Sequence, residues 1–204
     1  MATPASDAKA GARPSPRAPK QPDRRLRLDD ILRLMVADGL IDNAQAETVG
    51  HMRVRAAQHP LELIAAQGWR MAKPPGKPMT LEWLVEWLAG KLKLAYLHID
   101  PLKIDLAAVT ATMSNAYAER FHILPVAVDR LTVTVATSEP FVRAWADDLE
   151  EMIKREVKFV FANPADIKRY LGEFYNLARS MKKAQETSKG QLALTGNFEQ
   201  LVEL

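Results

Sequence analysis

Four histidines and several carboxylates are the residues of this sequence whose chemistry could support catalysis or metal binding. The histidines are His51, His59, His98 and His122, and no two of them are spaced as in an H-x-x-x-H pair. That spacing is the usual way to place two imidazoles on one metal, so we expect no metal site and a structural or surface role for each histidine. The chain has no cysteine, which excludes a thiolate nucleophile and a zinc site built on sulfur.

An acidic run and one Gly-Lys pair complete the candidates for enzymatic chemistry. The carboxylates within 147–151 would spread over different sides of a helix, which is typical of a solvated surface. Gly76-Lys77 superficially resembles a phosphate-binding loop, but that motif needs a glycine where Met71 stands and a Ser or Thr where Pro78 stands. The sequence therefore predicts no catalytic and no cofactor-binding residue, and we expect the chain not to be an enzyme.

Two tryptophans in the segment 81–92 are the strongest candidates for a binding site. At about 100° per residue, Trp83 and Trp87 fall on the side of a predicted helix roughly opposite its apolar stripe. Such a pair is either buried between two halves of the chain or exposed as a docking site, since tryptophan is enriched at binding hot spots. Trp69 and Trp145 are expected in the core. The stripe consists of Leu81, Leu84, Val85, Leu88 and Leu92.

The start of the chain is a basic arm. Residues 1–28 carry seven Lys/Arg against two Asp, whereas the remaining residues carry 21 basic and 23 acidic side chains. Because residues 1–21 contain no Leu, Ile, Val or aromatic residue, we predict that residues 1–27 are disordered. Arg24, Arg25 and Arg27 are either a solvated end of this arm or contacts for anionic lipid or an acidic partner. The slight excess of acidic side chains after residue 28 argues against a nucleic-acid partner.

Length and composition indicate a soluble protein with one domain or two small ones. The chain has 204 residues, of which 48% are hydrophobic and 26% charged. Its apolar runs are too short to cross a bilayer, and no hydrophobic run follows the basic start, so we expect neither a transmembrane segment nor a secretory signal. The absence of cysteine suits a reducing, cytoplasmic compartment.

The pattern from residue 28 to residue 94 is helical. Apolar spacing predicts a helix from Leu28 that Gly39 ends, and a second from Asp42 as N-cap to about residue 58. A third spans 60–67, and a fourth spans 81–92 behind Thr80 as N-cap. The Pro- and Gly-rich segment 73–78 is predicted as a loop.

After residue 94 the pattern alternates between strand and helix in the order β-α-β-β-α-β-α. The predicted fold class is therefore α+β, with an N-terminal helical subdomain (28–94) and a compact second subdomain (95–179) that holds a small mixed sheet. Residues 180–204 are polar and Gly-broken and are predicted as a linker. The predicted strands are 95–99, 123–128, 131–137 and 157–162, and the predicted helices are 105–118, 140–153 and 163–179, the last one capped by Asn163 with Pro164 at its first position.

Six short segments resemble the N-terminal region of the type II secretion and type IV pilus assembly ATPases, the secretion protein E family. Their order and spacing carry the resemblance more than any single segment does, and together they span about residues 28–178. The segments are Val36–Asp42, Leu92–Asp100, Ile104-Asp105, Tyr117–Val126, Leu131–Pro140 and Phe161–Ile167.

The resemblance implies a noncatalytic docking and regulatory domain that couples a hexameric motor to the cytoplasmic region of an inner-membrane platform protein. Its second partner would be its own C-terminal ATPase domain, toward which residues 180–204 would lead and in which alone ATP would be used. We therefore expect a cytoplasmic location, peripheral to the inner membrane through partners. Arg24, Arg25, Arg27, Trp83 and Trp87 are the candidate partner contacts.

Some members of this family bind cyclic di-GMP through two copies of a motif that opens with Arg-Leu-Gly and closes with Gln. Here the first copy opens on Asp30-Ile31-Leu32 and closes on Arg53, and the second opens on His59-Pro60-Leu61 and closes on Lys91. The arginine that would pair with phosphate is missing from both. We expect a related domain without this ligand. The alternative function is a cyclic di-GMP-binding regulatory domain of the same family.

Overall fold

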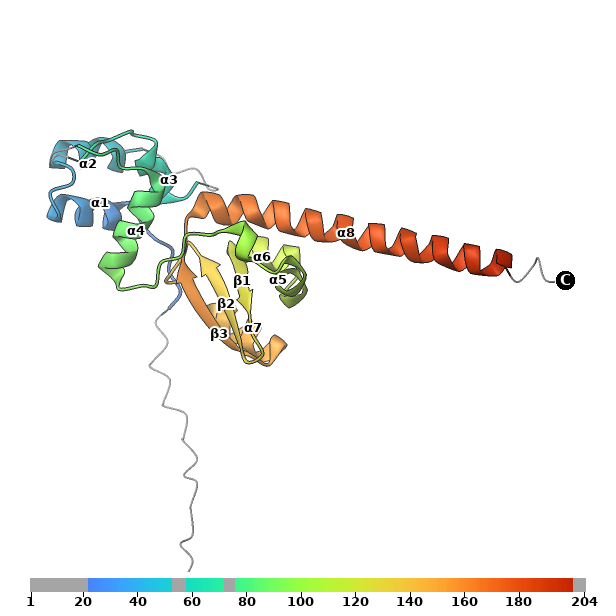
Figure 1. Cartoon of the computed structure of the whole chain (residues 1–204). Helices are drawn as coiled ribbons and strands as arrows, with labels where there is room; N and C mark the ends of the chain where they lie inside the picture. Colours follow the sequence, from blue (N-terminus) through green and yellow to red (C-terminus); the bar gives the residue numbers. More distant parts are fainter. Residues whose placement is uncertain (1–21, 53–57, 72–75, 200–204) are drawn as a thin grey trace, which may run out of the picture.

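The computed structural model describes residues 22–52, 58–71 and 76–199, with the backbone alone for 186–199 (Figure 1). Four helices come first, a small sheet flanked by helices follows, and one long helix leaves this body. The structure thus confirms the predicted α+β class with a small mixed sheet. The first four helices are α1 (Leu28–Ala37), α2 (Asn43–Gly50), α3 (Pro60–Ala65) and α4 (Leu81–Leu92).

Local capping explains where these helices begin. The Asp42 side chain accepts from the Gln45 N–H at 2.7 Å, and the Gln45 amide oxygen accepts from the Asp42 N–H at 3.0 Å, which completes the predicted capping box. At α4, the Thr80 hydroxyl accepts from the Trp83 N–H at 3.2 Å. Gly39 follows α1 with φ of +66°, a left-handed conformation that glycine adopts without strain.

The second helix is shorter than predicted. It ends at Gly50 rather than near residue 58, because glycine weakens a helix and the chain turns at His51 and Met52. Residues 53–57, which include Arg53, lie outside the described residues. So do residues 72–75, which include the first half of the predicted loop 73–78.

The sheet has three strands in the order β1 (Ile123–Val128), β2 (Thr132–Thr137), β3 (Glu156–Phe161). β1 and β2 form an antiparallel hairpin with a register shift between Pro125 and Ala127. Residues 129–131 connect them, one residue more than the predicted strands 123–128 and 131–137 would leave. β2 and β3 are parallel, so the chain crosses over between them through α7 (Ala144–Ile153).

The predicted strand 95–99 is wrong as a full strand. It reduces to a single parallel bridge between Tyr96 and Phe161, with hydrogen bonds from Leu97 N–H to the Phe161 carbonyl and from Phe161 N–H to the Ala95 carbonyl. Pairing stops there because β3 ends at Phe161 and the chain turns into a helix capped by Asn163.

Two predicted helices differ in their bounds. The helix predicted at 105–118 is divided into α5 (Leu106–Thr112) and α6 (Asn115–Phe121), since Met113 is extended and Ser114 caps a new helix. A short 3₁₀ helix, η1 (Pro101–Lys103), precedes them. The helix predicted from residue 140 begins only at Ala144, as α7.

The last helix, α8 (Pro164–Glu199), is longer than predicted. The sequence predicts an end at Arg179 and a linker over 180–204, but the helix continues through 180–199, and 200–204 lie outside the described residues. No proline interrupts this stretch, and an isolated interior glycine costs only about 1 kcal/mol. Figure 1 shows α8 projecting far from the sheet.

The basic arm is ordered in its last part, which corrects the prediction for residues 22–27; residues 1–21 lie outside the described residues. The Asp23 carboxylate accepts from the N–H groups of Arg143 and Ala144 at 2.8 and 3.0 Å. It therefore caps α7, whose own N-cap residue Arg143 makes no side-chain cap. Leu26 is buried and donates its N–H to Glu139 at 2.8 Å.

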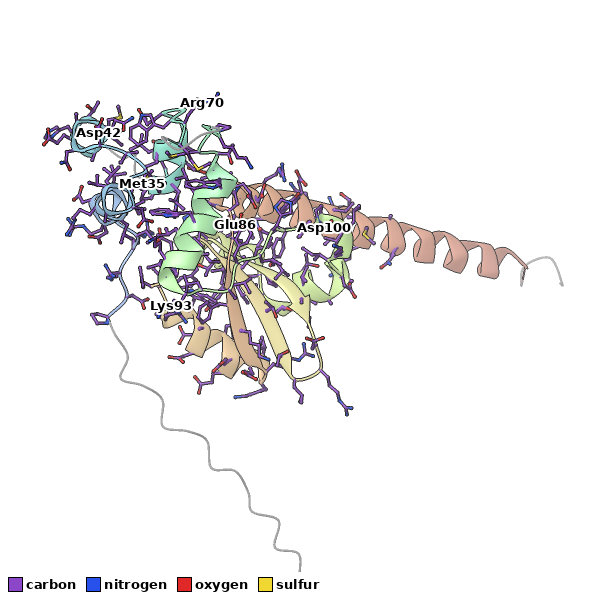
Figure 2. The ribbon with its side chains drawn as sticks, turned by 60° about the vertical axis from the view of Figure 1, so that its left-hand side comes forward. Met35, Asp42, Arg70, Glu86, Lys93 and Asp100 are labelled. Atoms are coloured by element: carbon purple, nitrogen blue, oxygen red, sulfur yellow. The ribbon has the colours of Figure 1, made fainter. Side chains whose placement is uncertain are left out.

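Two apolar clusters organise the interior. One lies among α1–α4 and the other between the sheet and α5–α8, where the predicted core residue Trp145 is fully buried. Phe161 belongs to the helical cluster although it is the last residue of β3. In Figure 2, α4 stands between the other helices of its half and the sheet, so α4 and Phe161 join the two clusters.

Candidate functional site

The tryptophan pair is an ordered feature of α4. The rings of Trp83 and Trp87 are stacked, with centroids 6.4 Å apart and planes inclined by 10°. Trp87 donates its indole N–H to Asp38 at 2.8 Å, and Lys91, one turn further along α4, pairs with the same carboxylate at 2.6 Å. These two contacts hold the pKa of Asp38 below its usual range. Asp38, which follows α1, was not a candidate from the sequence.

Both indoles are half-buried against the helical cluster. The sequence allowed two interpretations, burial between two halves of the chain or exposure as a docking site. The observed partial burial lies between them. The contact that orients Trp87 lies within the helical half, because Asp38 follows α1. Each ring therefore has a fixed position and keeps part of its surface open to solvent.

The three arginines of the candidate site lie in different surroundings. Arg24 stacks over Phe141 at 4.3 Å from the ring centroid and pairs with Asp30 at 3.4 Å. Arg27 is exposed and pairs with Asp29 at 3.4 Å. Arg25 lines a cavity at the junction of the two halves. Within the described residues, no contact joins any of these guanidinium groups to the tryptophan pair, so the five predicted contacts do not form one cluster.

The junction cavity that Arg25 lines has a volume of about 450 Å³. Its walls come from the arm, from the start of α3, from the chain after β2 and from the first turns of α8. Charged and polar groups converge there from all four segments: Arg25, His59, Glu139, Lys168, and also His122 after α6. No local sequence pattern indicates this grouping, because its members lie far apart along the chain.

His59 and Glu139 are the buried ionisable groups of this cavity. The His59 ring accepts from the Leu61 N–H through Nδ1 at 3.3 Å, so Nε2 carries the proton and faces the Ser138 carbonyl at 3.1 Å. Burial lowers the pKa of His59 to about 4, against the opposing effect of the Ser138 carbonyl. Burial raises the pKa of Glu139. His59 is therefore neutral near pH 7, and its contact with Glu139 is not an ion pair.

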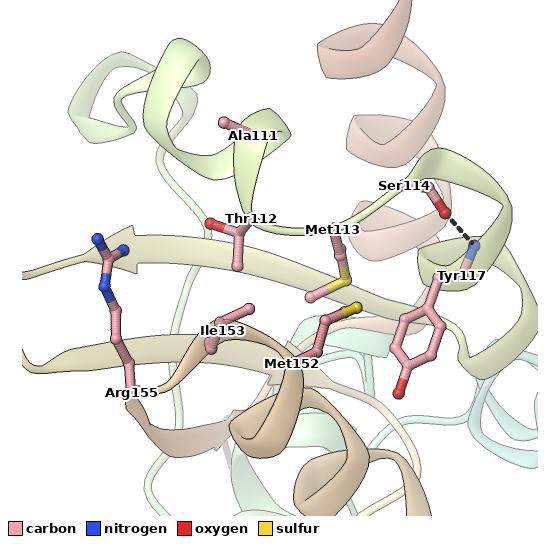
Figure 3. A pocket seen from close by; sticks show the side chains of 8 residues that line it. All are labelled: Ala111, Thr112, Met113, Ser114, Tyr117, Met152, Ile153 and Arg155. Carbon is pink, nitrogen blue, oxygen red and sulfur yellow. Dashed lines mark hydrogen bonds between the residues drawn. The ribbon is translucent and has the colours of Figure 1, made fainter.

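A second cavity, of about 560 Å³, lies in the α/β half between the α5–α6 connection and the end of α7. Figure 3 shows Met113 and Met152 pointing toward one another there, with Tyr117 beside them and Arg155 at the rim. The Tyr117 hydroxyl donates to the Trp145 carbonyl at 3.0 Å. The lining mixes apolar and polar side chains, and its residues include no pair of groups arranged for acid–base catalysis.

The positions that align with the nucleotide motif have structural partners. Ile31 and Leu32 are buried in the helical cluster, and Asp30 pairs with Arg24 and Arg33. At the second copy His59 is turned toward Ser138, and Lys91 at the closing position pairs with Asp38. The side chains at these described positions are thus buried or paired with other residues of the chain.

Residues 92–181 match the MshEN domain. The chain is similar to the N-terminal domains of type IV pilus and type II secretion ATPases. The match is to this domain and not to the catalytic motor. In the described residues, no helix is long and apolar enough to span a membrane.

One curated protein and two solved structures are similar to this chain. The type IV pilus assembly ATPase TfpB of Acinetobacter baylyi is 31% identical over 161 residues, which are 77% of this chain and 28% of that protein. The chain thus spans little more than a quarter of the length of this relative. The structure of MshE with cdg has a TM-score of 0.50 at 20% identity and covers 74% of this chain and 100% of that one, which shows a shared fold. The N-terminal domain of XpsE has a TM-score of 0.45 at 13% identity, over 73% and 97% of the two chains.

Proposed function

We propose that this chain is a noncatalytic docking and regulatory domain of a type IV pilus or type II secretion ATPase. It binds the cytoplasmic region of an inner-membrane platform protein and relays its position to a C-terminal motor. In this proposal the domain is cytoplasmic and reaches the inner membrane only through its partners. The MshEN match and the pilus ATPase relative support the class.

The observation that carries the docking role is the stacked pair on α4. Trp83 and Trp87 are half-buried, and Asp38 fixes the second ring, so neither loses much conformational freedom when a partner covers it. Large aromatic side chains held in this way are the usual centres of protein interfaces. Arg24, Arg25 and Arg27 would add contacts to an acidic region of the same partner, in a salt-dependent manner.

The relay rests on the connection between α4 and α8. Glu82 in the first turn of α4 accepts a hydrogen bond from the Asn163 side chain at 2.8 Å, and Asn163 caps α8. From that point α8 runs without a break for 36 residues, about 54 Å at 1.5 Å per residue. A displacement of α4 by a docked partner would therefore be passed to the start of a long, continuous helix.

The docking role predicts that the double substitution Trp83→Ala and Trp87→Ala weakens binding to the platform protein's cytoplasmic region about a hundredfold or more, since hot-spot residues each contribute about 2 kcal/mol or more. Binding can be measured by calorimetry, and folding by thermal melting of the same variant. Trp69→Ala is the matched control, because Trp69 is also a half-buried tryptophan of the helical cluster. Its affinity should stay near that of the unchanged chain.

Two results would contradict the docking role. If the double variant loses cooperative melting, the pair is a part of the core. If it melts normally and still binds the partner with unchanged affinity, the docking surface lies elsewhere.

The alternative function, cyclic di-GMP binding, has support from the structure of MshE with cdg, which shares this fold. Titration calorimetry of this chain with cyclic di-GMP is expected to show no binding at micromolar concentrations. The reason is that both motif openings lack arginine and that Lys91 already pairs with Asp38. A dissociation constant of about 1 μM or lower, equivalent to about −8 kcal/mol, would favour the alternative.

A further inference from the structure

Three potential metal ligands meet where the two halves of the molecule join. Glu82 lies in the first turn of α4, His98 in the segment between α4 and η1, and Asp166 in the first turn of α8. One carboxylate oxygen from each acid and one ring nitrogen of His98 lie within 4.8 Å of one another. His98 Nδ1 lies 2.8 Å from Glu82 Oε1.

The Glu82 carboxylate is already held in position by neighbours. The Tyr96 hydroxyl donates to its Oε1 atom, and the Asn163 side-chain amide donates to its Oε2 atom at 2.8 Å. Asp166 is oriented by Arg169 at 3.0 Å. Hydrogen-bonded neighbours of this kind fix the carboxylates of metal sites, and their loss weakens metal binding.

The donor set selects a class of ion. One imidazole and two carboxylates suit Zn²⁺ and similar first-row divalent ions, whereas Mg²⁺ and Ca²⁺ prefer oxygen donors alone. Atoms bound to one Zn²⁺ at about 2.1 Å lie roughly 3–3.5 Å apart. The His98 and Glu82 atoms, 2.8 Å apart, must therefore separate slightly, and any pair near the 4.8 Å limit must come closer. The His98 side chain is 68% exposed and can turn to do so, and its Nδ1 proton would pass to solvent. Water would complete the coordination.

We propose that Glu82, His98 and Asp166 bind a divalent ion of the zinc class, which clamps α4 to the first turn of α8. This goes beyond the docking role, because it adds an inorganic ligand at the connection through which docking would be relayed. Histidine spacing could not reveal the site, since only one histidine takes part and the acids come from two distant helices. The ion would stabilise the association of the two halves, and the stabilisation would grow with the logarithm of the free ion concentration once that concentration exceeds the dissociation constant.

The test is a calorimetric titration of the untagged full chain, stripped with a chelator, with ZnCl₂ and separately with MgCl₂. We expect one equivalent of zinc to bind and magnesium to give no binding heat. His98→Ala should weaken zinc binding at least about tenfold. His51→Ala is the matched control, because His51 is an exposed histidine of the helical half, and it should bind zinc as the unchanged chain does.

A thermal melt supplies the second measurement. Zinc should raise the melting temperature of the unchanged chain and of His51→Ala, but not of His98→Ala or Asp166→Asn, provided that each variant melts cooperatively without zinc. The proposal is overturned if the unchanged chain binds no zinc, or if His98→Ala and Asp166→Asn bind it with unchanged affinity.

Discussion

Replacing Phe161 with alanine is expected to lower the free energy of unfolding by about 3–5 kcal/mol and to uncouple the helical half from the α/β half. Phe161 is 1% exposed and ends β3, yet its ring packs in the helical cluster. Removing the ring leaves a void at the place where the two clusters meet. The backbone bonds to Ala95 and Leu97 remain, so the loss would come from packing.

Urea unfolding followed by circular dichroism, together with hydrogen exchange, measures both parts of this prediction. The amides of α1 and α4 should exchange faster in Phe161→Ala than those of β1 and β2. The matched control is Phe159→Ala in the same strand, since Phe159 is only half-buried and packs on the α/β cluster. That variant should lose less stability and unfold in one transition. Equal losses, or one transition in both variants, would contradict the role assigned to Phe161.

The second large effect is a loss of stability as the pH falls from about 6.5 to about 4. Burial lowers the pKa of His59 from 6.5 to about 4, so the unfolded chain takes up a proton in this range while the folded chain stays neutral. The contribution of His59 to the free energy of unfolding is therefore fully present above pH 6.5 and is lost as the pH approaches 4. At 1.36 kcal/mol per pH unit, the loss amounts to about 3 kcal/mol.

The variant His59→Asn isolates this contribution. Asparagine does not titrate and can still cap α3 by accepting from the Leu61 N–H, as the His59 ring does. Urea unfolding between pH 4 and pH 7 should show that the free energy of unfolding depends less steeply on pH in His59→Asn than in the unchanged chain. The difference in slope corresponds to at most nearly one proton taken up on unfolding.

Glu139 acts in the opposite direction within the same cavity. Burial raises the pKa of Glu139, so the folded chain binds that proton more readily and is favoured as the pH falls toward the raised value. For this reason the comparison uses the difference between the two chains rather than the slope of either. His51→Asn, an exposed control, should keep the slope of the unchanged chain. An unchanged slope in His59→Asn would show that His59 is not responsible.

Signals within a few residues of one another were enough to predict much of the fold. Three helix caps could be predicted from the sequence because each cap and its target lie three residues apart or fewer. They are the capping box of Asp42 and Gln45, the Thr80 cap and the Asn163 cap. The hairpin of β1 and β2 was predictable for the same reason, although its connection is one residue longer than predicted. The order of short segments also indicated the family, which the comparisons confirmed. The misplaced end of α8 followed from interpreting the polar, Gly-broken residues 180–204 as a linker, although no proline ends the helix there.

The sequence by itself therefore determined the local elements, their order and the class of protein. Only the tertiary structure decided which distant residues meet: Asp23 caps α7 across 120 residues, and Asp38 orients Trp87 across 49. It also placed the arginines in separate surroundings and brought Glu82, His98 and Asp166 together. The physical reason is that helix caps and hairpin turns are set by neighbours in sequence, whereas side-chain clusters depend on how whole helices pack, which no local pattern specifies.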